Sequence, residues 1–355
     1  MRIAVGMSGG VDSSVTALLL KERNFDVFGI SMTICSDKHA KPRTKRHVCY
    51  GPEEQEDIKR AQEVCGIIGI PFYTINCSEQ YQNIVLAYFR REYQSGRTPN
   101  PCVRCNELMK FDFLLGAARK TGLSFDKFAT GHYVRAEHDT IDNRYILKKA
   151  KDRKKDQSYF LYRLSQIQLS QAVFPLGDYH KDEVKDIAHK QGLPVTNAHE
   201  SQDFYSGDYC ELLNIKEKEG NIVDINGAVL GKHRGIWAYT IGQRRGLGIS
   251  SPRPLYVIGI HRTKNEVVVG PEEDTYNETL VAKDIRWVSV QNIRGKMKVD
   301  AKIRSSHVGS RAVIKPIEWG KVHVKFDFPQ RSISPGQSVV FYDEDILVGG
   351  GIIYG

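Results

Sequence analysis

The sequence has no run of apolar residues long enough to cross a membrane, and it has no low-complexity repeats. A spanning helix needs about 20 consecutive apolar residues, so we expect no membrane segment and a chain that folds throughout. The initial stretch MRIAVGMSGG is typical of the start of a strand rather than of a signal peptide. We therefore expect a cytoplasmic protein, in which thiols stay reduced and structural disulfides are disfavoured.

No single sign of charge dominates the chain, although positive charge is in excess. The 355 residues include 51 Lys and Arg against 42 Asp and Glu, which gives a net charge of +9. This moderate excess favours anionic partners such as RNA or phosphates, but by itself it is a weak indication. The length allows two or three domains, each with a core of its own.

The first half of the chain alternates short apolar runs with amphipathic stretches. Such alternation is typical of an α/β fold in which a parallel sheet carries helices on both faces. The predicted strands are 2–7, 26–32, 71–77 and 125–133, and the predicted helices are 13–24, 53–69 and 103–119.

The alternation fades near residue 195, and the chain then becomes rich in glycine and turn residues. From residue 280 onward, short strands of alternating residues are separated by turn signals about every ten residues, which is typical of a small β-barrel or sandwich. We therefore predict three domains: an α/β domain at 1–200, a central linker domain at 201–278 and a C-terminal β-barrel at 279–355.

The heptapeptide SGGVDSS, residues 8–14, directly follows the first predicted strand and opens the first predicted helix. Gly9 and Gly10 allow backbone angles at which successive N–H groups converge on an anion, and the three serines add hydroxyl donors. The loop suits pyrophosphate, yet it has neither the Walker pattern nor the glycine pattern of dinucleotide folds. Asp12 is then a candidate ligand for the magnesium ion that accompanies ATP.

Two of the seven cysteines stand three residues apart in TPNPCVRCNELMKF, residues 98–111. The apolar stripe of residues 103–119 predicts an amphipathic helix, with Pro101 in its first turn. Cys105 would lie near the N-terminus of this helix, where the partial positive charge favours a thiolate and lowers the thiol pKa. A thiolate at this position would be a nucleophile, whereas Cys65 and Cys77 are expected to be buried and inert.

Basic stretches add candidate contacts to RNA, each with a simpler alternative. KDRKKDQ at 151–157 has enough cations for phosphate contacts or forms a solvated surface, and GQRRGLG at 242–248 is a basic loop or an RNA contact. Cys35 and Cys49 flank another basic segment, residues 36–47, which contains His39 and His47. Their spacing matches no common zinc finger, which favours a loop that faces RNA.

The loop at 8–14 resembles the signature of the ATP pyrophosphatase superfamily. Further motifs resemble those of the bacterial tRNA-specific 2-thiouridylases, in the same order and along the whole chain. They are GRTPNPCVRCNELMKF (96–111), ATGHY (129–133), KDQSYFL (155–161), ESQDF (200–204), YTIGQRRGLGI (239–249) and SPGQSVVFY (334–342).

The resemblance implies an ATP-dependent 2-thiolation of the wobble uridine in tRNAs for Lys, Glu and Gln. ATP would activate oxygen 2 of the base as an adenylate, and sulfur would then displace AMP. The implied cofactors are ATP and magnesium, and the implied partners are tRNA and a sulfur donor protein or sulfide. The implied ATP ligands are Gly6, Met7, Ser8, Gly9, Gly10, Val11, Asp12, Ser13, Met32 and Gly131. The implied tRNA contacts are Asn100, Pro101, Cys102, His132, Lys155, Asp156, Gln157, Arg304, Ser305 and Gln337.

For the sulfur chemistry, the resemblance implies that Cys105 delivers or accepts sulfur and that Cys102 assists. In one mechanism Cys102, Cys105 and Cys210 bind an iron–sulfur cluster that carries sulfide; in the other, one cysteine holds a persulfide and a second resolves it as a disulfide. This chain departs from the family because Tyr205 occupies the expected place of the next cysteine. Cys210 either replaces that thiol or packs in the core, and the alternative to a thiolase is a divergent tRNA-binding paralogue without the activity.

Overall fold

The computed structural model describes residues 1–35, 49–51, 53–195, 205, 212–213, 216–318 and 320–354. The chain divides into two compact units, each assembled from separate segments. The first unit comprises residues 1–85, 102–207 and 345–347, and the second comprises 86–101, 208–344 and 348–355.

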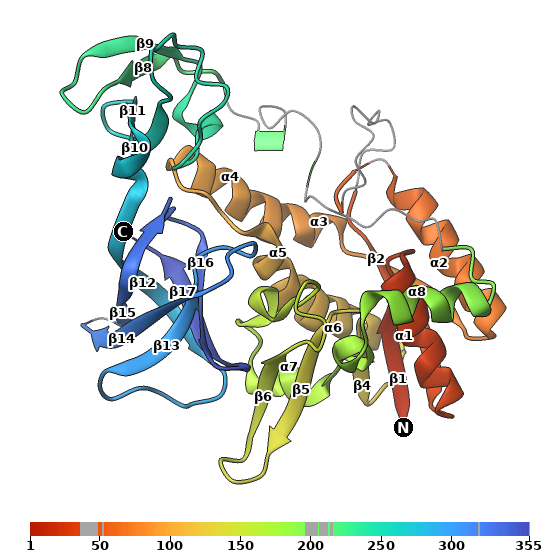
Figure 1. Ribbon diagram of the computed structural model, residues 1–355. Helices are drawn as coiled ribbons and strands as arrows, with labels where there is room; N and C mark the ends of the chain where they lie inside the picture. Colours follow the sequence, from red (N-terminus) through yellow and green to blue (C-terminus); the bar gives the residue numbers. More distant parts are fainter. Residues whose placement is uncertain are drawn as a thin grey trace. The chain divides into compact units, whose positions relative to one another are not determined.

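The first unit is built on a parallel sheet with strand order β3-β2-β1-β4-β7 (Figure 1). Its strands are β1 (Arg2–Gly6), β2 (Asp26–Thr33), β3 (Phe72–Asn76), β4 (Lys127–Ala129) and β7 (Ala172–Val173), with a hairpin of β5 (Val134–Asp139) and β6 (Arg144–Lys149). Its α-helices are α1 (Val11–Glu22), α2 (Glu54–Ile68), α3 (Ser78–Tyr81), α5 (Pro101–Arg104), α6 (Leu114–Lys120), α7 (Gln166–Gln171) and α8 (Lys181–Lys190). Turns of π-helix cover Gln82–Leu86 and Cys105–Phe113, and 3-10 turns cover Ser158–Leu161 and Pro175–Asp178.

Both faces of this sheet are covered by helices. Successive side chains of β1 point to opposite faces, and those in its middle are buried. Ile3 and Val5 point into a core shared with α1, α2 and α8, and α1 and α8 lie side by side (Figure 1). On the other face Ala4 pairs with Phe128 of β4, and the Phe128 ring packs edge-on against Phe111, 5.3 Å between centroids. This confirms the predicted parallel α/β fold, and it places the Cys105–Phe113 segment against the sheet.

The helix predicted at 103–119 is not a uniform α-helix. It begins as α5, changes to π-helix at Cys105 and returns to α-helix at Leu114. A π-helical turn inserts an extra residue into the ladder of hydrogen bonds and is frequent at functional sites. The predicted strand at 125–133 is also shorter than expected, since β4 ends at Ala129, and the β5–β6 hairpin was not predicted.

The second unit contains α4 (Ala87–Gln94), a small mixed sheet and a β-barrel. The small sheet has the order β10-β11-β8-β9, from β8 (Gly220–Val223), β9 (Val229–His233), β10 (Tyr256–His261) and β11 (Glu266–Gly270). The barrel strands are β12 (Tyr276–Trp287), β13 (Met297–Lys302), β14 (Ser310–Ile317), β15 (Lys321–Arg331), β16 (Ser338–Asp343) and β17 (Ile346–Ile353). Short 3-10 turns lie at Ile236–Ala238 and Glu272–Thr275.

The barrel strands follow the order β12-β15-β14-β13-β16-β17, and β12 also pairs with β17, which closes the barrel. Side chains that point inward from successive strands form its core, and they include Val299, Ala312, Val324 and Phe341. The barrel confirms the prediction made from the turn spacing of residues 280–355.

Candidate active site

The loop between β1 and α1 has the geometry of an anion-binding site. Gly9 has φ +73°, and a Cβ there would lie 2.4 Å from the carbonyl oxygen of Asp57, so only glycine fits. The Ser8 N–H donates to Ser13 Oγ at 3.2 Å, which curls the loop over the start of α1. Gly10 is the N-cap and has no side chain to cover the first N–H groups of α1, and such groups bind phosphate oxygens.

Gly131, which follows β4, packs directly against this loop. A Cβ on Gly131 would lie 2.8 Å from both the carbonyl carbon of Asp12 and the nitrogen of Ser13. Both are backbone atoms, so any larger residue would displace the first turn of α1. Gly6, Met32 and Gly131 stand at or just beyond the carboxyl ends of β1, β2 and β4, where open parallel sheets bind ligands.

The Asp12 carboxylate is held by two side chains that the sequence did not single out. Lys181 Nζ of α8 donates to both Asp12 oxygens, at 2.7 and 2.8 Å, and the Tyr133 hydroxyl donates to Oδ1 at 2.8 Å. Lys181 is buried, whereas the Asp12 side chain is 30% exposed. A buried ammonium next to the phosphate loop adds positive charge at the place where an anion would bind.

His132 continues the site from Gly131 toward the cysteine helix. Its Nδ1 shares a hydrogen bond with Thr130 Oγ1 at 2.8 Å, and its ring contacts the rings of Phe111 and Phe174, with centroids 6.2 and 6.4 Å away. Burial, reinforced by the nearby Lys110 ammonium, lowers the pKa of His132 well below its usual value. The imidazole is therefore neutral at pH 7 and acts by hydrogen bonding and stacking rather than as a cation.

Cys105 is the buried thiol of the site. Burial raises its pKa to about 11, the Lys110 ammonium opposes that rise, and charge on Cys49 adds to it. This corrects the expectation of a lowered pKa, because desolvation outweighs the partial charge of the helix terminus. The Lys110 ammonium lowers the pKa of both Cys105 and His132. The thiol and the imidazole therefore lie near one cation, and His132 directly follows Gly131 of the phosphate site.

Comparison with known proteins identifies the family. Family models match along the chain: a tRNA methyl transferase HUP domain over 1–205, a tRNA methyl transferase PRC-barrel domain over 212–271 and an aminomethyltransferase beta-barrel domain over 277–353. The tRNA-specific 2-thiouridylase MnmA of Endomicrobium trichonymphae is 49% identical over 356 residues, 99% of each chain. The chain belongs to the tRNA-specific 2-thiouridylase family. A second relative, tRNA-specific 2-thiouridylase MnmA 1 of Caldanaerobacter subterraneus, is 50% identical over 99% of this chain and 97% of its own.

In the first unit of this thiouridylase family member, two of the predicted tRNA contacts are tied into a turn. Asp156 Oδ1 accepts from the Ala150 N–H at 3.1 Å, and its Oδ2 accepts from Ser158 Oγ at 2.9 Å. Gln157 Oε1 accepts from the Tyr133 N–H at 2.9 Å. These two side chains fix the backbone beside His132, while Lys155, from the same turn, is half-buried.

In the second unit, the segment that leads to the cysteine helix is fastened to the loop before β16. The Thr98 N–H donates to the Pro335 carbonyl at 2.8 Å, and Gln337 Nε2 donates to the Pro99 carbonyl at 3.4 Å. This brings Gln337 next to Asn100 and Pro101, three residues that the family resemblance assigned to tRNA. Arg304 lies elsewhere in the unit, donating to the Arg331 carbonyl at 3.1 Å, and Ser305 beside it is exposed.

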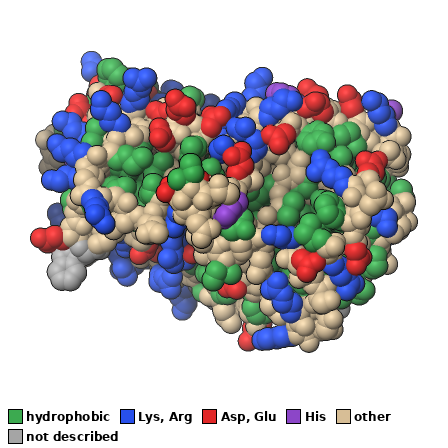
Figure 2. Space-filling model, turned by 90° about the horizontal axis from the view of Figure 1, so that it is seen from below, with side chains coloured by type: hydrophobic (Ala, Val, Ile, Leu, Met, Phe, Trp, Pro, Cys, Tyr) green, Lys and Arg blue, Asp and Glu red, His purple; other side chains and the backbone are tan. Residues whose placement is uncertain are grey.

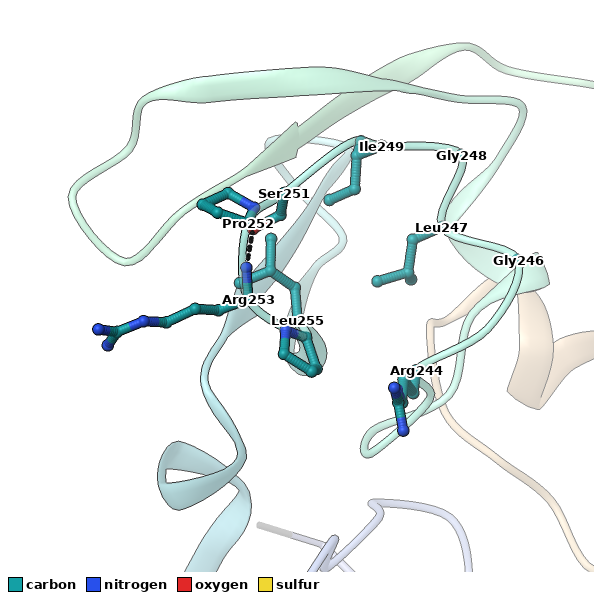
Figure 3. Close-up of a pocket in the computed structure, with 10 residues that line it drawn as sticks. Arg244, Gly246, Leu247, Gly248, Ile249, Ser251, Pro252, Arg253 and Leu255 are labelled. Atoms are coloured by element: carbon teal, nitrogen blue, oxygen red, sulfur yellow. Dashed lines mark hydrogen bonds between the residues drawn. The ribbon is translucent and has the colours of Figure 1, made fainter.

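The basic loop of the thiouridylase's central region forms a shallow pocket of its own. Its lining runs from Arg244 to Leu255, and Figure 3 shows Leu247 and Ile249 directed inward while the Arg253 guanidinium extends away. On the face of the molecule drawn in Figure 2, Lys and Arg side chains are interspersed with acidic ones rather than gathered in one patch. The excess of positive charge is therefore not concentrated on that face.

The described residues do not form a resident metal centre. Across the parts of the chain that the structure describes, no three His, Cys, Asp or Glu side chains are placed to hold a metal ion. Asp12 would be the protein ligand of a magnesium ion that arrives on the phosphates of ATP, in exchange for a hydrogen bond from Lys181 or Tyr133, because such an ion needs only one or two protein carboxylates. The cluster expected on Cys102, Cys105 and Cys210 stays a prediction, because Cys210 lies outside the described residues, as do His39 and His47.

The remaining cysteines and the helices agree with two simpler expectations. Cys65 and Cys77 are buried, and burial raises the pKa of each thiol to about 12, as expected for inert cysteines. Within the described residues, every helix is too short or too polar to span a bilayer.

The raised pKa of Cys105 predicts a steep pH dependence of its alkylation. Because iodoacetamide reacts with the thiolate, the rate at Cys105 should rise about tenfold per pH unit from pH 7 toward pH 11. Lys110→Gln removes the ammonium that favours the thiolate, so it should slow alkylation at every pH below the pKa. Peptide mass spectrometry measures both profiles, and a rate that levels off below pH 8 would contradict the raised pKa.

Proposed function

We propose that the protein catalyses ATP-dependent 2-thiolation of the wobble uridine in tRNAs for Lys, Glu and Gln, releasing AMP and pyrophosphate. The observation that carries the proposal is the continuity of the site from the phosphate loop, through Gly131 and His132, to Lys110 and Cys105. A loop for pyrophosphate provides activation of an oxygen, and a thiol beside it provides the sulfur that replaces that oxygen.

In the proposed first step, the N–H groups of the 8–14 loop and the start of α1 bind the phosphates of ATP. Lys181, held by Asp12, lowers the energy of the charge that develops as pyrophosphate leaves. Magnesium on the phosphates, with Asp12 as its protein ligand, would supply further neutralisation. Oxygen 2 of the uracil attacks the α-phosphorus, and the base becomes an adenylate.

In the proposed second step, Cys105 carries a sulfane sulfur that its thiolate takes from a persulfide on a donor protein, whose own thiolate is the leaving group. Its terminal sulfur attacks carbon 2, and AMP leaves. The apolar walls made by Phe111 and Phe174 exclude water, which would otherwise hydrolyse the adenylate. Lys110 stabilises the sulfur anion as it forms.

We assign tRNA binding chiefly to the second unit. Arg304, Ser305 and the 244–253 loop offer cationic and hydroxyl groups to phosphates, while Asn100 and Pro101 contact the target base. Such phosphate contacts make affinity fall steeply with salt.

The test uses the purified chain with ATP, magnesium, polysulfide as a sulfane-sulfur donor and unmodified tRNA for Lys, Glu or Gln. Nucleoside mass spectrometry should detect 2-thiouridine, with one AMP formed for each modified base. A tRNA in which the wobble uridine is replaced by cytidine is the matched control. Binding of tRNA without thiouridine or AMP would instead support a tRNA-binding paralogue and reject the proposal.

Gly131→Ala is expected to raise the KM for ATP by roughly tenfold or more, because its Cβ would push the backbone of Asp12 and Ser13 out of place. Gly116→Ala is the matched control: a Cβ there meets nothing within 4 Å, and alanine stabilises a helix relative to glycine. Initial rates of AMP release at varied ATP measure both, and equal KM values would contradict the role given to Gly131.

A further inference from the structure

Cys49 is a second thiol near the Cys105 site, and it comes from a part of the chain that the sequence analysis did not connect with Cys105. Cys49 is exposed and precedes Tyr50, whose ring stacks on Tyr81 with 5.5 Å between centroids and 12° between planes. Gln82 Nε2 also donates to the Tyr50 hydroxyl at 2.9 Å. These two contacts hold the backbone at Cys49 beside α3.

Tyr81 is the common neighbour of the thiols. It is 1% exposed, and charge on Cys105, Cys49 and Cys102 raises its pKa further after the larger effect of burial. Charge on Cys49 also raises the pKa of Cys105 itself. The segments that carry the two thiols meet at α3, because Tyr50, next to Cys49, stacks on Tyr81 of α3, and α3 packs against the Cys105–Phe113 segment.

The position of Tyr205 supports the same pairing. Its ring lies 6.3 Å from that of Tyr50, so the place where the family resemblance led us to expect a cysteine is next to the segment that carries Cys49. The other nearby thiol, Cys77, is fully buried and its pKa is raised to about 12. Cys49 is accessible to solvent, which can take its proton.

We propose that Cys49 is the resolving thiol that releases sulfur from Cys105 onto the activated base. This inference rests on the proposed function, and it assigns the second cysteine of that reaction to a residue outside the Cys102–Cys105 motif.

The step balances as thiol–disulfide exchange. The terminal sulfur of a Cys105 persulfide bonds to carbon 2 of the base and the bond to AMP breaks, which leaves Cys105 joined to the base through two sulfurs. The Cys49 thiolate, its proton lost to water, attacks Cys105 Sγ. The sulfur–sulfur bond breaks, its electron pair stays on the base sulfur, and 2-thiouridine leaves. Cys49 and Cys105 are thereby oxidised to a disulfide, which an external dithiol reduces for the next turnover.

The experiment follows a single turnover of the full chain in the absence of reductant. The Cys105 persulfide is loaded first, and ATP and tRNA are then added so that the base is adenylated. The wild-type protein should release 2-thiouridine and leave a Cys49–Cys105 disulfide in the peptide map. Cys49→Ser should slow release by about 100-fold or more and accumulate tRNA bound to Cys105 through a disulfide. Dithiothreitol should reduce that disulfide and free tRNA that contains 2-thiouridine.

Cys35→Ser, at the other end of the 36–48 segment, is the matched control and should behave as wild type. Wild-type release by Cys49→Ser without reductant, or a disulfide from Cys105 to Cys102 or Cys210, overturns the proposal. Failure of the wild-type protein to make 2-thiouridine under any condition rejects the proposed function instead. Diamide oxidation of the resting protein gives an independent readout, since the Cys49–Cys105 disulfide should form there without tRNA, and its absence counts against the pairing.

Discussion

Cys105→Ser is expected to abolish 2-thiouridine formation, with a loss on the order of 10⁴-fold or more, and to leave tRNA binding within a factor of about two. A serine oxygen cannot hold a sulfane sulfur, yet the hydroxyl has nearly the shape of the thiol, so the buried surroundings stay packed. Nucleoside mass spectrometry measures the product, and filter binding with labelled tRNA measures the affinity.

The same variant separates the two chemical steps. Adenylation precedes sulfur attack, so Cys105→Ser should still release pyrophosphate once for each bound tRNA. Pyrophosphate release without thiouridine supports the order of steps, whereas thiouridine made at a wild-type rate would remove Cys105 from the mechanism.

Glu107→Ala is expected to destabilise the first unit by about 3–5 kcal/mol, because it leaves a buried guanidinium without its carboxylate. Arg163 Nε donates to Glu107 Oε2 at 2.6 Å, and the two side chains are only 7% and 8% exposed. Arg104 of α5 also donates to Glu107, at 3.1 Å, so the loss reaches the helix that precedes Cys105. Scanning calorimetry should show a fall in Tm of roughly 10 °C.

The matched control for Glu107→Ala is Glu137→Ala on the β5–β6 hairpin. Glu137 pairs with Lys148 at 2.5 Å, but its side chain is 49% exposed, and exposed pairs contribute at most about 1 kcal/mol. Similar shifts in Tm for the two variants would mean that the Glu107 pair contributes no more than a surface contact. Loss of thiolation by Glu107→Ala at a temperature where it remains folded would add a positioning role near Cys105.

The phosphate site could be predicted from sequence because its signals are local. Two glycines, three serines and the start of a helix stand within residues 8–14, and the alternation of apolar runs places that loop at the carboxyl end of a parallel strand. Lys181 was missed because it lies 169 residues from Asp12, in a helix whose other charged residues face solvent. Only the packing of α8 on α1 brings the ammonium to the loop.

The cysteine helix was placed correctly, but its electrostatics were predicted wrongly. The position of Cys105 near a helix start is a sequence property, whereas the desolvation that raises its pKa depends on what surrounds it. Lys110 was missed for a related reason. It lies five residues beyond Cys105, and in an α-helix residues five apart do not share a face, so no effect of its ammonium on the thiol was expected. The π-helical path from Cys105 to Phe113 changes which residues share a face.

The way the chain is divided between the units limits how the protein can be dissected. Residues 97–99, just before the cysteine helix, are held by the loop at 335–337, while Asp345 and Ile346 complete the first unit by binding Arg135 and pairing with Lys148 of β6. A chain cut before the barrel would lose both the anchor of the segment before Cys105 and an edge of the first unit. Residual activity in such a truncated enzyme would therefore not measure the contribution of tRNA affinity alone, and point substitutions in the barrel are the sounder way to isolate it.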